Sequence, residues 1–310
     1  MKNNTKLNEK QKDLNKKEAL HRIEQCRKLQ SKKLDLSWLY LDELPDELSS
    51  LIRLEELDLN YNNLSHLPDW IGNFPKMISL FISSNNLKSL PDSIGNLKKL
   101  KVISLSENRL VTLPETFGNL ISLEEFYLTE DDNYPDNEKK HGQKSWFTHL
   151  PESFSNLTSL KVFYIQNTKL EKLPEYFGNF TLLRELCVQT EARLPSLFYP
   201  ESMKNLKSLK EVSINGFETV PDFVAGLKEL TKLDISHNML YKLPDFIGKL
   251  KKLKVLNVHS TWITELPEWI LDLRKLVELD TSSNYITVKR EIYNKLPKSI
   301  QDNFFSEQIV

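Results

Sequence analysis

The sequence has only two cysteines, Cys26 and Cys187, among its 310 residues. They lie far apart and match neither a disulfide framework nor a CxxC pair, so a disulfide-stapled fold and a CxxC zinc or redox site are excluded. No stretch approaches the 18 apolar residues of a membrane span, and no apolar run follows the charged start as it does in a signal peptide. We therefore expect a cytoplasmic protein that does not act at a membrane.

The common catalytic and nucleotide-binding motifs are also missing. The chain contains no GxxxxGK[ST], GxGxxG, GxSxG or HExxH segment, and its six histidines do not cluster with cysteines. Asp131, Asp132 and Asp136 lie in one polar segment, but the spacing of an EF-hand and its closing glutamate are absent. We expect no catalysis, no metal, no cofactor and no small-molecule substrate.

Basic and acidic side chains are almost equal in number, with 42 Lys and Arg and 43 Asp and Glu. The charges are unevenly placed, because residues 1–33 carry eleven Lys or Arg against four Asp or Glu. In this segment the lysines alternate with Asn, Gln and Glu instead of forming a cluster, which argues against binding to nucleic acid.

One phrase is abundant and recurs at a fixed spacing. LPDWIGNF at 67–74, LPDSIGNL at 90–97 and LPETFGNL at 113–120 are nearly identical, and further copies follow. The period is 23 residues, with the template LxxLxLxxNxLxxLPxxIGNLxx starting at Leu54 and again at Met77. A fixed period of this length indicates a stack of structural repeats, each too small to bury its leucines alone.

Each conserved position of the template predicts a local structure. The LxL alternation places its leucines on one face of a short strand and leaves the other face in solvent. Asparagine at the ninth position is expected to pair with backbone groups where the chain leaves the strand. Proline at the fifteenth predicts a short, loop-like return segment. Five of the eight glycines recur at one later position and predict a tight bend with permissive φ.

These units resemble leucine-rich repeats, specifically the intracellular 23-residue LPxxIGNL kind. That kind occurs in bacterial proteins, plant intracellular Ras-group-related repeat proteins and animal Ras-pathway scaffolds. The lead-in EALHRIEQCRKLQSKKLDLSWLYLDELP also resembles the helical segment that precedes such repeats in bacteria, including those of Roco proteins. The resemblance implies a partner-binding scaffold without catalysis.

The predicted fold class is an α/β solenoid: a leucine-rich repeat horseshoe of about eleven turns, with a parallel sheet on its concave face. Residues 1–15 are expected to form a disordered basic tail, 16–33 a helical cap, 34–288 the solenoid and 289–310 a C-terminal cap. A polar insertion interrupts the repeats at about 129–147. In the first cap, the apolar stripe Leu20, Ile23, Cys26 and Leu29 is expected to cover the first strand.

The exposed strand positions are the expected partner-binding surface, because they are free of packing roles. Their fifth position is aromatic in central turns and acidic at both ends. The predicted binding residues are Trp38, Tyr61, Phe81, Tyr127, Tyr164, Asp234, His237, His259 and Asp280. Rigid aromatic rings flanked by charge are typical of interface hot spots. The alternative is that Phe and Tyr stand there only as good strand formers.

The leading hypothesis for function is a non-catalytic protein-binding scaffold or inhibitor, whose partner has a basic, partly apolar surface. The alternative is a regulatory sensor module that acts with a separately encoded signalling enzyme such as a GTPase. A third, less favoured reading is an enzyme or zinc site in which Cys187 lies near His237 and His259.

Overall fold

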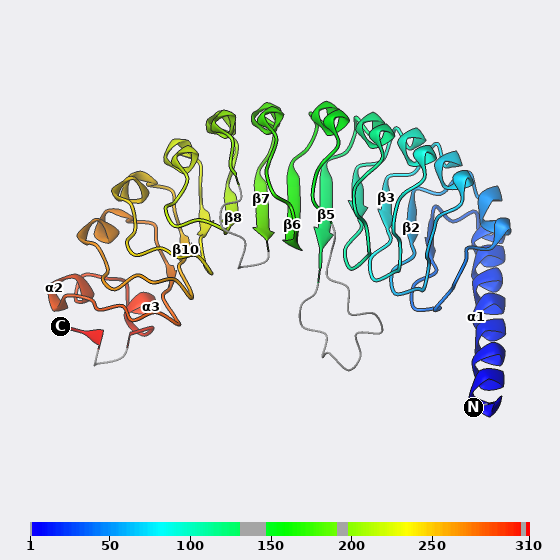
Figure 1. Cartoon of the computed structure of the whole chain (residues 1–310), viewed down its shortest axis with the longest axis horizontal. Coiled ribbons are helices and arrows are strands. Elements are labelled where there is room, and N and C mark those ends of the chain that lie inside the picture. Colours follow the sequence, from blue (N-terminus) through cyan, green and yellow to red (C-terminus); the bar gives the residue numbers. More distant parts are fainter. Residues whose placement is uncertain (1, 131–146, 191–197, 305–307) are drawn as a thin grey trace. The chain divides into compact units, whose positions relative to one another are not determined.

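A computed structural model describes residues 2–130, 147–190, 198–304 and 308–310 of the chain (Figure 1). The chain divides into two compact units, which we treat separately. Unit 1 comprises Met1–Leu160 and Asn167–Lys169, and unit 2 comprises Lys161–Gln166 and Leu170–Val310. Most of the insertion predicted at 129–147, including Asp131, Asp132 and Asp136, lies outside the described residues.

Unit 1 begins with a helix and continues as a ladder of parallel strands. Its elements are α1 (Lys2–Lys28), β1 (Lys33–Asp35), β2 (Glu56–Asp58), β3 (Ser79–Phe81), β4 (Val102–Ser104) and β5 (Glu125–Thr129). Neighbouring strands pair in parallel with an offset of one 23-residue period, so that Lys33 faces Glu56 and Glu56 faces Ser79. The 3-10 helices that link them are η1 (Asp46–Ser50), η2 (Asp69–Asn73), η3 (Asp92–Asn96), η4 (Glu115–Asn119) and η5 (Glu152–Asn156).

Unit 2 repeats this pattern and ends in two short helices. Its strands are β6 (Val162–Thr168, whose last two residues belong to unit 1), β7 (Glu185–Thr190), β8 (Glu211–Ile214), β9 (Lys232–Asp234), β10 (Val255–Asn257) and β11 (Glu278–Asp280). The 3-10 helices are η6 (Glu175–Asn179), η7 (Glu201–Asn205), η8 (Asp222–Gly226), η9 (Asp245–Lys249) and η10 (Glu268–Asp272), and the closing helices are α2 (Arg290–Tyr293) and α3 (Lys298–Gln301). Within the described residues, eleven parallel strands in chain order confirm the predicted repeat solenoid.

The core is built from the leucine positions of the template. In β2, Leu57 is fully buried while its neighbours Glu56 and Asp58 are only half-buried, as the LxL alternation predicts. The same contrast recurs in the other three-residue strands. One face of the strands therefore supplies the core, and the other is partly exposed to solvent.

The asparagines of the ninth position form the expected ladder of buried amides. The Asn85 Oδ1 atom accepts a hydrogen bond from the Leu64 amide at 3.0 Å, and its Nδ2 donates to the carbonyl oxygens of Leu59 at 3.0 Å and Ile82 at 3.2 Å. Asn62 and Asn108 repeat these contacts in their own turns. Each amide thus joins two neighbouring turns through backbone groups that the bend leaves unpaired.

The return segments are more regular than the loops that the prolines predict. In all ten, a five-residue 3-10 helix starts directly after a proline, as η2 does after Pro68. Proline suits this place because its φ, −69° at Pro68, is preset and the first turn of a helix has no partner for its N–H.

The glycines serve close packing, not a bend with unusual φ, so the sequence-based interpretation was wrong. Of the described glycines, only Gly216 has a positive φ. A Cβ added to Gly72 would lie 2.1 Å from the carbonyl oxygen of Ser93 in the next turn, and one added to Gly95 would lie 2.3 Å from that of Thr116. Glycine is required here because successive 3-10 helices approach backbone to backbone.

The N-terminal helix is longer than predicted and its buried stripe is shorter. α1 starts at Lys2 instead of residue 16, because the segment has good helix formers and no Gly or Pro. Ala19, Ile23 and Cys26 are buried against the first turn, whereas Leu29 lies beyond the helix end and is 75% exposed. None of the described helices combines the length and apolar character needed to cross a membrane.

The C-terminal helices close the last turn as the sequence predicts. Ile292, Leu296 and Ile300 are buried, and Pro297 separates α2 from α3. α3 packs against β11, so apolar side chains cover the end of the sheet in unit 2.

Candidate partner-binding surface

The surface of interest is the solvent face of the strands, by which we mean the third, fifth, seventh and eighth positions of each turn. Along unit 1 its fifth positions bring Asp35 beside Asp58 and Asp58 beside Phe81 in the parallel register. Burial, followed by the nearby charges of Asp35 and Glu56, raises the pKa of the Asp58 carboxyl. Basic side chains lie against two of these carboxylates: Lys33 Nζ is 2.7 Å from Glu56 Oε2, and Arg22 Nη1 is 3.9 Å from Asp35 Oδ1.

An aromatic pair stands at the eighth position of the first two turns. The rings of Trp38 and Tyr61 stack with centroids 3.7 Å apart and an interplanar angle of 11°. They remain 57% and 36% exposed. Both residues hold the left-handed backbone conformation, with φ of 60° and 57°. For bulky residues this conformation is costly, and such strain is often found at functional sites.

Later turns place mostly small or polar residues at the same left-handed position. They are Ser84, Glu107, Asn167, Gly216, His237, Ser260 and Ser283. The eighth position therefore does not itself require an aromatic ring. Tyr40, also left-handed with φ of 50° and 56% exposed, adds a third aromatic side chain near this end of unit 1, which the sequence did not lead us to select.

The remaining predicted aromatic residues of unit 1 are half-buried on the solvent face. Phe81 lies in β3 and Tyr127 in β5. The Tyr127 hydroxyl donates a hydrogen bond to the Glu125 Oε2 atom at 2.9 Å on the same strand. Neither side chain is in the fully buried core, so part of each ring is exposed to solvent.

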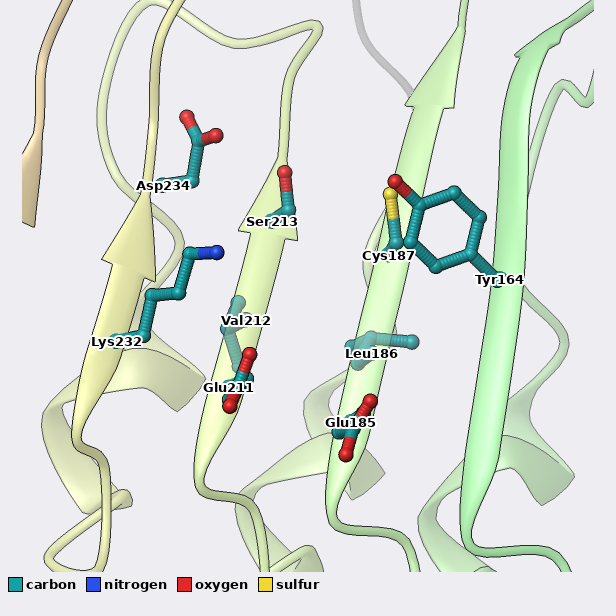
Figure 2. A pocket seen from close by; sticks show the side chains of 9 residues that line it. All are labelled: Tyr164, Glu185, Leu186, Cys187, Glu211, Val212, Ser213, Lys232 and Asp234. Atoms are coloured by element: carbon teal, nitrogen blue, oxygen red, sulfur yellow. The ribbon is translucent and has the colours of Figure 1, made fainter. Parts of the chain in front are cut away.

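Unit 2 has a hollow on its solvent face, which we call the socket (Figure 2). It has a volume of about 110 Å³ and is open to solvent. One row of its lining consists of the register partners Cys187, Ser213 and Asp234, with Tyr164 on the β6 side. The second row consists of the register partners Glu185, Glu211 and Lys232.

Cys187 forms the floor of the socket and is 4% exposed, although its strand position predicts a solvent-facing side chain. The reason is the Tyr164 ring beside it, whose hydroxyl is hydrogen bonded to the thiol (Figure 2). Burial raises the pKa of the Cys187 thiol to about 11 and that of the Tyr164 hydroxyl to about 12. Both groups are therefore neutral at pH 7, and the thiol lacks the low pKa of a catalytic nucleophile.

The two predicted histidines of unit 2 lie together, as expected from their adjacent turns. The ring centroids of His237 and His259 are 5.0 Å apart. The Nδ1 atom of His259 shares a 2.7 Å hydrogen bond with the Ser282 hydroxyl, which also donates to the Asp280 carboxylate. Burial opposes ionisation of Asp280, but hydrogen bonds from Ser282 and the charge of His259 hold its pKa below the usual range.

The predicted residues thus fall into two sets. Trp38, Tyr61, Phe81 and Tyr127 lie on the solvent face of unit 1, and Tyr164, Asp234, His237, His259 and Asp280 on that of unit 2. Cys187 lies in the socket with Tyr164, and not in a cluster with the histidines. Among the described residues, no three His, Cys, Asp or Glu side chains meet in a way that could hold a metal ion.

The sequence did not reveal the socket, although one signal for it was present. In the fifth position the short side chains of Cys187 and Ser213 stand between the larger Tyr164 and Asp234. Neighbouring strands lie about 4.8 Å apart. Two successive short side chains in one row therefore leave a gap between the longer side chains on either side.

Comparison with known proteins agrees with the repeat architecture. A profile described as a leucine-rich repeat region matches residues 142–239, and two further leucine-rich repeat profiles match residues 75–132 with 228–286 and residues 53–74. No curated protein sequence gives a match.

Several solved structures share the fold. A leucine-rich repeat protein of Leptospira interrogans is 27% identical with a TM-score of 0.63, over 84% of this chain and 68% of that one. An internalin of Listeria monocytogenes is 21% identical with a TM-score of 0.62, over 85% and 76% of the two chains. The Arabidopsis receptor kinase HAESA, in complex with the peptide hormone IDA and the co-receptor SERK1, is 23% identical with a TM-score of 0.63, over 84% of this chain and 47% of that one. At these low identities, the similarities to the internalin and to HAESA show only that the fold is shared. With the profile matches, the repeat geometry identifies this chain as a leucine-rich repeat protein.

Proposed function

We propose that this protein is a non-catalytic scaffold or inhibitor that binds another protein through the solvent face of its strands. One observation carries the proposal: Trp38 and Tyr61 are stacked and exposed on a left-handed backbone that later turns fill with smaller residues. An exposed aromatic pair gives the folded chain little packing in return for its backbone strain. It offers rigid ring surface to a partner at low entropic cost.

The partner that this surface suits is basic and partly apolar. Asp35 and Asp58 lie side by side in the first two strands of unit 1, and Asp234 and Asp280 stand in the same position in unit 2. Carboxylates around aromatic rings complement a surface on which Lys and Arg surround apolar side chains. Two cysteines without a disulfide framework favour the cytoplasm as the place of action.

The test is capture of the partner from the source cell, followed by affinity measurement with the purified pair. The variant Trp38→Ala with Tyr61→Ala is expected to raise the Kd by tenfold or more and to leave the melting temperature within a few degrees. Tyr241→Ala with Trp262→Ala is the matched control, because these rings also form an exposed pair, with centroids 5.2 Å apart, but lie outside the strands. Loss of binding in the control with normal binding in the first variant would contradict the proposal.

A further inference from the structure

We infer that the socket of unit 2 receives one cationic side chain of the protein partner, a lysine or an arginine. The inference rests on the proposed protein-binding function and assigns a chemistry to one place on that surface. It follows from the shape of the socket, its charge and its neutral floor.

The shape suits a single long side chain. Tyr164 and Asp234 stand on strands three spacings apart, about 14 Å, and the side chains of Cys187 and Ser213 between them are short. A chain of hydrogen bonds fixes the edge of the hollow: Gln166 Nε2 donates to Gln189 Oε1 at 2.8 Å, and Gln189 Nε2 donates to Ser213 Oγ at 2.8 Å. The socket is therefore already formed without a partner.

The charge of the lining selects a cation. Among the side chains that line the socket, Glu185, Glu211 and Asp234 are acidic and Lys232 is basic, so acidic groups outnumber basic ones. An acidic side chain entering the socket would meet repulsion, and a purely apolar one would remove water from carboxylates without replacing it. A basic side chain compensates that loss through charge-assisted hydrogen bonds.

The floor suits the aliphatic stem of such a side chain. The ring of Tyr164, which covers the Cys187 thiol, presents neutral, polarisable surface against which methylene groups can pack (Figure 2). The Tyr164 ring also attracts a cation that lies over its face. Asp234 stands at the opposite end of the row, where it can pair with the charged tip (Figure 2).

The test uses the full chain and peptides selected on it from a randomised display library. Peptides weakened by Tyr164→Ala are expected to contain a Lys or Arg whose neutral replacement, norleucine for Lys or citrulline for Arg, raises the Kd at least tenfold. On the Asp234→Asn variant, the charged and neutral peptides are expected to bind within about twofold of each other. Asparagine keeps an acceptor for the Ser236 amide, which now donates to Asp234 Oδ1 at 3.0 Å, so the local turn is retained.

Asp280→Asn is the matched control, because Asp280 has the same position on β11 and the same kind of bond, from the Ser282 amide at 2.9 Å, but lies outside the socket. It is expected to keep the charged peptides at least tenfold tighter than the neutral ones, even where it slows their association. The inference is overturned if no selected peptide is weakened by Tyr164→Ala, if the weakened ones lack a basic residue, or if the difference survives Asp234→Asn. If the selected peptides still lost affinity on replacement of Trp38 and Tyr61, the proposed function would hold even though the socket inference had failed.

Discussion

At the scale of single residues, the buried asparagines hold the turns together. Asn85 is 7% exposed; its side chain accepts from the Leu64 amide and donates to the Leu59 carbonyl, both in the preceding turn, and donates to the Ile82 carbonyl of its own turn. Replacing it with alanine leaves the Leu64 amide without its acceptor in a dry interior, whereas the Leu59 carbonyl keeps the Asn62 Nδ2 donor at 2.9 Å. Each unsatisfied buried group costs about 1–3 kcal/mol.

We therefore expect Asn85→Ala to lower the free energy of unfolding by about 1–3 kcal/mol. Chemical denaturation with an unchanged m-value is the measurement. Asn86→Ala is the control, because the half-buried Asn86 side chain makes no hydrogen bond within the described residues, and a change below about 0.5 kcal/mol is expected for it. Equal effects in the two variants would refute the role of the ladder.

A second residue-scale prediction concerns alkaline pH. The pKa of the Cys187 thiol is about 11 in the fold against an ordinary value of 9.0, because burial disfavours the thiolate. The folded chain therefore holds this proton more tightly than the unfolded chain does, and the stability linked to it, complete below pH 9, is lost as the pH rises toward 11. Between pH 8.5 and 10.5 the melting temperature of the wild type should fall further than that of Cys187→Ala. If the melting temperatures of the two proteins fell equally over this pH range, the pKa of the thiol would not be raised by burial.

At the scale of elements, the 3-10 helices are held by glycines that have no room for a side chain. A Cβ on Gly95 would meet the backbone oxygen of Thr116 at 2.3 Å, so two helices would have to move apart. A Cβ on Gly226 would have as its nearest neighbour the Nζ atom of Lys207 at 3.1 Å, which is the end of a flexible side chain, and the backbone oxygen of Lys204 would lie 3.9 Å away, at ordinary contact distance. Substituting alanine for these two glycines, which lie in equivalent helices, should therefore change the stability of the protein in different ways.

We expect Gly95→Ala to destabilise the protein by about 2 kcal/mol or more, since it introduces a backbone clash at a close-packed contact. Gly226→Ala should be neutral or stabilising by about 0.4–1 kcal/mol, because alanine restricts the unfolded chain and fits the native backbone. Equilibrium unfolding of both variants is the measurement. A stable Gly95→Ala protein would mean that the helices do not pack this closely.

At the scale of the whole molecule, the sequence predicted most of the fold and less of its surface. The repeat period was sufficient to predict the strands, the buried leucines and the asparagine ladder, because these features depend only on the position of a residue within its turn. The close approach at Gly72 depends on the neighbouring turn, and the socket on side-chain lengths across four strands. The left-handed backbone at Trp38 follows from the bend after the strand, and a template of residue types does not reveal it.

The last prediction separates the roles of rings and charges in binding. Tyr164 contributes ring surface to the socket, so Tyr164→Ala should weaken the captured partner by roughly 1–3 kcal/mol, mainly through faster dissociation. Asp280 lies outside the socket, and an Asp280→Asn change should mainly slow association and reduce its dependence on salt, as for other charges at the edge of an interface. Surface plasmon resonance at two ionic strengths distinguishes these effects. If Tyr164→Ala binds normally, the aromatic residues of this face are present as strand formers and the partner binds elsewhere.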